Sequence, residues 1–221
     1  MKLAFSLIFK CFIFTLAIFG IYLTLVNAVN PFETISYFTT LVNGYAVISY
    51  LFFIFNLIVK KYPSSLLVFI KQNLMVFLLL TLMVYSFVLI PYITDNQLNY
   101  QIFSLKDLVI HYAVPLLVVV DYALFSPKGQ IKKSYLFINL LGLVVYLLYL
   151  YLYTSLGGRF SLSGTLTIYP YFFLDIPTLG VVNFSLIAIA IIIVVLLLGW
   201  CIFQIDELIS IPLISPKPKR K

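Results

Sequence analysis

Apolar residues in this chain gather in six long runs, and polar or turn-forming residues separate one run from the next. Each run is close to the roughly 20 residues that an α-helix needs to cross a bilayer. The predicted spans cover approximately residues 11–29, 37–59, 74–94, 108–125, 134–156 and 179–204. The pattern predicts an all-α fold, a polytopic membrane helix bundle with six transmembrane spans, as a single integral membrane domain over residues 1–221.

Two prolines fall inside predicted spans, Pro91 in the third and Pro115 in the fourth. Proline lacks a backbone N–H, but transmembrane helices tolerate it where neighbouring groups satisfy the freed carbonyl. We expect both prolines to bend their helices.

The basic residues predict the orientation of the bundle. With the N-terminus inside, the inside segments hold Lys2, Lys10, Lys60, Lys61, Lys71, Lys128, Lys132, Lys133, Lys217, Lys219, Arg220 and Lys221. The outside segments hold only Lys106 and Arg159. By the positive-inside rule, both termini are predicted on the cytoplasmic side.

Composition supports the membrane assignment and limits the function classes. Hydrophobic residues make up 63% of the chain and charged residues 10%, which no soluble domain of this size can bury. The formal charge of the chain is +7, and its basic residues lie mostly in the inside segments, so we interpret the positive charge as a topology and headgroup signal. We expect membrane lipids or a lipid-like substrate as partners, and no nucleic acid. Nothing in the sequence indicates a cofactor, a metal-ligand cluster or a particular protein partner.

The two ends of the chain leave alternatives open. Lys2, Lys10, the following apolar run and Val26-Asn27-Ala28 also fit a cleaved signal peptide, which would leave five spans. The apolar core is long for that role, so a retained span is favoured. The tail SPKPKRK fits a cationic anchor better than a retrieval signal. The plasma membrane is the expected location, or the endoplasmic reticulum in a eukaryotic host.

His111, the only histidine, lies inside the fourth span. An ionisable side chain within a span is costly and marks a candidate functional site. Asp107 is one helical turn earlier, about 6 Å along the axis, and on the same face. Its carboxylate is placed to hold the imidazole in one orientation. Asp121, near the inner end of this span, is interpreted as a charge partner of Lys128, Lys132 and Lys133.

A threonine pair lies at the matching depth of the second span. Thr39 and Thr40 begin that span, and Asn43 follows one turn later. A hydroxyl there can act as a nucleophile with His111 as its base, and the Asn43 amide can donate to an oxyanion. The alternative is structural: both hydroxyls bond to their own helix, and Asn43 joins two helices.

The segment TIYPYFFLDIP precedes the last span and is rich in aromatic residues and proline. We expect an interfacial structure that lies against the bundle. It is a possible roof over the site, formed by Tyr169, Pro170, Tyr171 and Asp175.

Three stretches are informative: YFTTLVN in the second span, HYAVPLLVVVDYALF in the fourth and YPYFFLD before the sixth. Together they resemble the androgen-induced membrane protein family. The family's animal members hydrolyse fatty acid esters of hydroxy fatty acids, and it has bacterial six-span relatives. The resemblance implies an intramembrane threonine nucleophile with a histidine base, and the histidine corresponds to His111.

The resemblance leaves the nucleophile open. Asn43 stands where animal members have an acidic residue, and aligning on it selects Thr40. Aligning Phe38 with the bacterial Phe-Thr pattern selects Thr39. The leading hypothesis is an intramembrane lipid-ester hydrolase that works near the outer leaflet. Alternatives are a non-catalytic lipid-binding or partner protein and a small-molecule transporter, although the span midplanes carry few charges.

Overall fold

The computed structural model describes residues 2–26, 28–59, 62–98, 100–162 and 165–210. In this part of the chain, six helical segments are long and apolar enough to cross a membrane. They are α1 (Lys2–Leu25), α3 (Phe38–Ile58), α4 (Ser65–Val84) continued by η1 (Tyr85–Leu89) and α5 (Ile90–Asp95), α6 (Leu105–Asp107) continued by η2 (Leu108–Ala113) and α7 (Val114–Phe125), α8 (Ser134–Ser155), and α9 (Ile176–Ser210). The predicted all-α bundle of six spans is confirmed, and the chain is an integral membrane protein. Its orientation stays a prediction.

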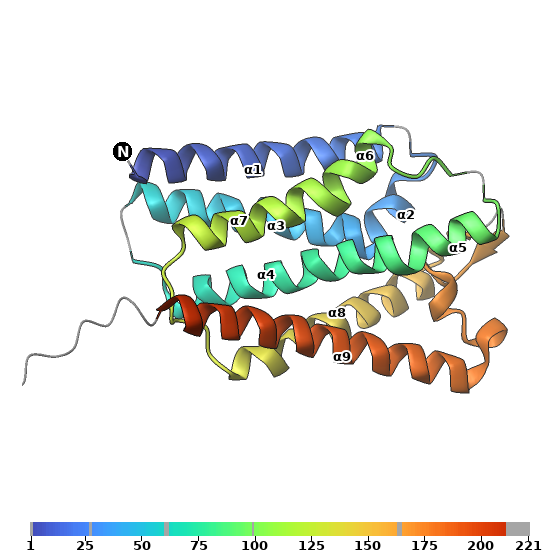
Figure 1. Cartoon of the computed structure of the whole chain (residues 1–221). Coiled ribbons are helices and arrows are strands. Elements are labelled where there is room, and N and C mark those ends of the chain that lie inside the picture. The colour runs from blue at the N-terminus through green and yellow to red at the C-terminus, as the bar shows by residue number, and fades with distance from the viewer. Residues whose placement is uncertain (1, 27, 60–61, 99, 163–164, 211–221) are drawn as a thin grey trace, which may run out of the picture.

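Helix α4 lies at the centre of the bundle (Figure 1). It packs against α3 and α7 on one side and against α8 and α9 on the other. Helix α1 packs against α3 and α7, so these three helices form one side of the bundle. Helix α1 begins and α9 ends at the same end of the bundle (Figure 1). The predicted cationic tail and Asn27 of the possible cleavage site lie outside the described residues.

The third span starts earlier than predicted, at Ser65 rather than residue 74. Lys71 was predicted in an inside segment before the third span, but the side chains of Lys71, Gln72 and Asn73 are all buried inside the bundle. A central helix buries every face, so polar residues there contact protein on all sides. Lys10 is likewise buried within α1, before the predicted start at residue 11. The salt bridges of Asp121 run to these two lysines, rather than to the loop lysines that the sequence suggested.

Each span proline follows a widened helical turn. The π-helical turn η1 precedes Pro91, and η2 precedes Pro115. In each turn the residue just before proline donates its N–H five residues back, from Ile90 to Tyr85 and from Val114 to Val109. A proline has no N–H to give, and its ring crowds the carbonyl four residues earlier. The wider turn accommodates this local conflict, as π-bulges do elsewhere.

Helix α1 approaches η2 very closely at Gly20. A Cβ atom at this position would come within 2.7 Å of the Ile110 side chain and 2.9 Å of Val109. Only glycine therefore allows this packing, which holds η2 against the bundle.

Short elements cover the end of the bundle where α3 begins. They are α2 (Pro31–Ser36), the antiparallel pair β1 (Phe160–Leu162) and β2 (Thr165–Thr167), and the 3₁₀ turn η3 (Phe172–Leu174). Asp175 then caps α9, because its carboxylate accepts from the backbone N–H and hydroxyl of Thr178.

Candidate functional site

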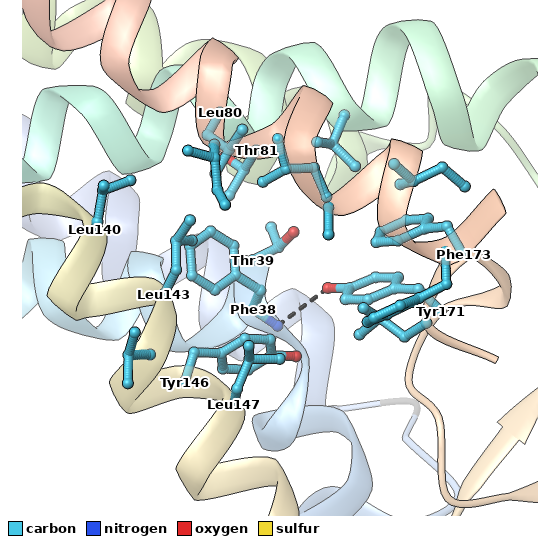
Figure 2. Close-up of a pocket in the computed structure, with 18 of the residues that line it drawn as sticks. Phe38, Thr39, Leu80, Thr81, Leu140, Leu143, Tyr146, Leu147, Tyr171 and Phe173 are labelled. Carbon is cyan, nitrogen blue, oxygen red and sulfur yellow. Dashed lines mark hydrogen bonds between the residues drawn. The ribbon is translucent and has the colours of Figure 1, made fainter. Parts of the chain in front are cut away.

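An apolar cavity of about 360 Å³ lies between α3, α4, α8 and α9 at this covered end. Figure 2 shows the Thr39 hydroxyl directed into it, with aliphatic and aromatic side chains around. Its walls include Phe38, Thr39, Leu80, Thr81, Leu140, Leu143, Tyr146, Leu147, Tyr171 and Phe173. The volume is within the range of ligand pockets, and the lining suits hydrocarbon.

Tyr171 supplies a polar group at the Thr39 side of this cavity. Its hydroxyl accepts a hydrogen bond of 3.1 Å from the backbone N–H of Phe38, the first residue of α3 (Figure 2). The side chains of Thr39 and Tyr146 lie near the Tyr171 hydroxyl and interact with it. Burial raises the pKa of Tyr171 to about 12, so the phenol keeps its proton at neutral pH.

The two threonines have different surroundings. Thr39 lines the cavity, whereas Thr40 is buried and is not among the lining residues. Consecutive residues on a helix point about 100° apart, which separates the two hydroxyls. The structure thus exposes Thr39, rather than Thr40, to a molecule in the cavity.

Asn43 joins this part of α3 to the turn that carries His111. Its Nδ2 donates to the carbonyl oxygen of Thr39 at 2.9 Å and to that of Ile110 at 3.2 Å. The Ile110 carbonyl needs an outside donor because Val114 bonds to Val109 and Pro115 has no N–H. The backbones of Thr39 and of the residue before His111 are therefore close together.

His111 is buried within η2 and held by ring stacking. Its imidazole lies on the Tyr85 ring, with centroids 3.8 Å apart and an interplanar angle of 5°. Nδ1 is buried and has no hydrogen-bond partner among the described residues. Tyr85 follows Val84, which lines the cavity. His111 and the cavity thus contact adjacent residues of the central helix.

Asp107 does not hydrogen-bond to His111. Its Oδ1 lies 3.9 Å from Nδ1, beyond hydrogen-bond length. The same carboxylate accepts from the hydroxyls of Tyr100 at 2.6 Å and Ser104 at 2.8 Å. Burial, reinforced by this carboxylate, raises the pKa of Tyr100. Asp107 is at a distance suited to electrostatic stabilisation of a protonated His111.

The structure changes two other predictions from the sequence, the role of Asn43 and the set of roof residues. Both Nδ2 hydrogens of Asn43 are used by carbonyl oxygens, so the amide joins helices and is not free to donate to an oxyanion. Of the proposed roof residues, Tyr171 lines the cavity; Tyr169, Pro170 and Asp175 are not among the lining residues.

Sequence reasoning missed Tyr85 and Tyr146. The stacking of Tyr85 on His111 depends on the packing of η1 against η2, which one sequence does not contain. The only available signal was the pair of span prolines, each of which follows one of these turns.

Among the described residues, no three His, Cys, Asp or Glu side chains are grouped to hold a metal ion. Comparison of the chain with protein-family models, curated proteins and solved structures found no match.

Proposed function

We propose that this chain is an intramembrane lipid-ester hydrolase with Thr39 as nucleophile and His111 as general base. The observation that carries the proposal is the Thr39 hydroxyl on the wall of an apolar cavity of about 360 Å³. A threonine hydroxyl beside an acyl chain in that cavity is well placed to meet an ester carbonyl.

The backbone that carries the proposed base, His111, lies close to the backbone of Thr39. Asn43 holds the backbones of Thr39 and Ile110 together, and His111 is the next residue. No hydrogen bond joins His111 to Thr39 or Thr40 among the described residues. Proton transfer therefore requires the side chains to approach on substrate binding, as catalytic hydrogen bonds often do.

The proposed reaction has two balanced steps. Thr39 Oγ1 attacks the ester carbonyl carbon while His111 accepts the hydroxyl proton, and the ester C–O bond breaks as His111 returns that proton to the leaving alcohol. His111 then takes a proton from water, which attacks the acyl-threonine carbonyl carbon; the acyl C–O bond breaks, the fatty acid is released, and His111 returns the proton to Thr39 Oγ1. The Tyr171 phenol, protonated and beside Thr39, is our proposed oxyanion donor in place of Asn43.

Labelling with a fluorophosphonate probe tests the proposal on purified, folded protein. We expect Thr39→Ala and His111→Phe to lose labelling and lipid-ester hydrolysis at least 100-fold. His111→Phe keeps a ring to stack on Tyr85 but removes the base. Thr39→Ser and Thr40→Ala should retain labelling.

Thr81→Ala is the matched control, since Thr81 also lines the cavity but donates its hydroxyl to the Leu78 carbonyl. Equal loss in Thr81→Ala and Thr39→Ala would contradict a specific nucleophile.

A second candidate is lipid binding without turnover, favoured by the almost wholly apolar cavity wall. Folded wild-type protein that retains a fluorescent fatty acyl ester, but neither labels nor hydrolyses it, would overturn the hydrolase and support this candidate.

A further inference from the structure

A second pocket, of about 130 Å³, lies at the opposite end of the bundle from the cavity. It is bounded by the start of α1, the end of α3, the start of α4 and the end of α7. Its lining includes Ser6, Lys10, Phe53, Lys71, Asp121 and Phe125. The positive-inside prediction assigns this end to the cytoplasmic leaflet, at the depth of lipid headgroups.

Three buried charges lie on the wall of this pocket. Asp121 is fully buried, and the side chains of Lys10 and Lys71 are 10% and 7% exposed. Lys10 Nζ lies 2.6 Å from Asp121 Oδ1, and Lys71 Nζ forms a salt bridge with Oδ2. Tyr50 donates its hydroxyl to Asp121 at 3.1 Å.

The cluster holds two ammonium groups against one carboxylate. Desolvating a charge without a counter-charge is strongly unfavourable, so the excess cation calls for an anion. No other acidic side chain is among the residues that line the pocket in the described chain.

Each ammonium also has donor capacity left. Lys10 donates to Asp121 and to Ser6 Oγ at 3.3 Å. Lys71 donates to Asp121 and to the Tyr50 hydroxyl at 2.7 Å. An ammonium carries three N–H donors, so one on each lysine is not used by the described residues.

We propose that this pocket binds one phosphate-type oxyanion between Lys10 and Lys71. Such an anion balances the extra charge and accepts the two remaining N–H donors; lysine is a common phosphate ligand. The source is either the headgroup of an anionic phospholipid or free phosphate. The aromatic and aliphatic wall at Phe53, Leu67 and Phe125 suits the glycerol and acyl part of a lipid. The site is independent of the proposed hydrolase.

Native mass spectrometry with phosphatidylglycerol and phosphatidylcholine tests the lipid source. We expect wild-type protein to retain one phosphatidylglycerol in preference to phosphatidylcholine. Lys10→Gln should weaken that retention at least tenfold. It leaves the neutral Lys71–Asp121 pair, so the variant should be at least as thermally stable as wild type without anion.

Lys132→Gln is the matched control because it makes the same charge change at an exposed residue outside the pocket. It should retain phosphatidylglycerol within twofold of wild type. Lys71→Gln leaves the neutral Lys10–Asp121 pair and should reproduce the loss, which gives a second variant if Lys10→Gln does not fold.

Thermal unfolding in phosphatidylcholine nanodiscs tests the other source, with inorganic phosphate against chloride at equal ionic strength. A phosphate-dependent rise in midpoint that disappears in Lys10→Gln, without selective lipid retention, assigns free phosphate. The proposal is overturned if neither probe shows a Lys10-dependent single site, or if Lys132→Gln weakens binding as much as Lys10→Gln.

Discussion

At the scale of single residues, Asn43 is the most informative side chain near the proposed site. It gives both amide hydrogens to carbonyl oxygens, one on its own helix and one on η2. A polar side chain in a membrane bundle often joins helices in this way. Its position beside Thr39 and Ile110 means that the same bond that stabilises the bundle also sets the spacing of the proposed catalytic pair.

Asn43→Ala should therefore destabilise the protein by about 1–3 kcal/mol, because the Ile110 carbonyl is left buried without a donor. Thermal unfolding in detergent, followed by circular dichroism, measures this as a lower midpoint.

Asn183→Ala is the control for that substitution. Asn183 makes one hydrogen bond to the Leu179 carbonyl at an exposed position of its own helix. We expect its loss to change the midpoint little. A drop in unfolding midpoint as large as that of Asn43→Ala would contradict a particular contribution of the Asn43–Ile110 hydrogen bond to stability.

At the scale of elements, the two π-helical turns explain how the site region is built. Pro91 and Pro115 each deprive a helix of one donor, and the turns before them widen. Tyr85 comes from one turn and His111 from the other, and their rings stack. The two turns therefore contact each other through this stack and through the Ser86–Tyr112 hydroxyl pair.

We expect coupling between Pro115 and Asn43, because both residues determine which donor the Ile110 carbonyl has. In Pro115→Ala, the new N–H of residue 115 can donate to the Ile110 carbonyl in a π-type bond. Asn43→Ala should then cost about half as much stability as in wild type, an interaction energy of roughly 0.5–1.5 kcal/mol.

A double-mutant cycle on unfolding midpoints measures this coupling. Strict additivity of the two substitutions would mean that the Ile110 carbonyl does not depend on Asn43 for its donor.

At the scale of the whole molecule, long-range polar contacts tie the last helix to the rest of the bundle. Asp206 of α9 accepts from the backbone N–H groups of Gly129, Gln130 and Ile131, at 2.8, 2.9 and 2.9 Å. The Tyr122 hydroxyl also donates to it, at 2.5 Å. This buried carboxylate fixes the connection between α7 and α8 against the end of α9.

Asp206→Asn should destabilise the fold by at least about 2 kcal/mol, because an amide replaces one charged acceptor oxygen with a donor facing N–H groups. Limited proteolysis should show faster cleavage between α7 and α8, together with a lower unfolding midpoint. Glu207→Gln, an exposed neighbour on the same helix, should leave both unchanged. Similar cleavage in the two variants would contradict the anchoring role.

The number of spans could be predicted from the sequence alone, because a lipid bilayer imposes requirements on consecutive residues of the chain. A chain in a bilayer must satisfy its own backbone hydrogen bonds and present apolar side chains over about 20 residues. Both requirements are local, so they can be found in runs of residues. They also marked His111 and the threonine pair as unusual, and they marked the two span prolines as special positions.

Tertiary structure decided which polar groups meet, because lateral packing of helices leaves little trace in one sequence. Lys71 was predicted in an inside segment before the third span, yet the central place of α4 buries Lys71, Gln72 and Asn73. The same packing pairs Asp121 with Lys10 and Lys71 and places Thr39, but not Thr40, on a cavity wall. The number of transmembrane spans is therefore determined by the bilayer that surrounds the chain. The residues that line the two pockets are determined by which helix faces pack together.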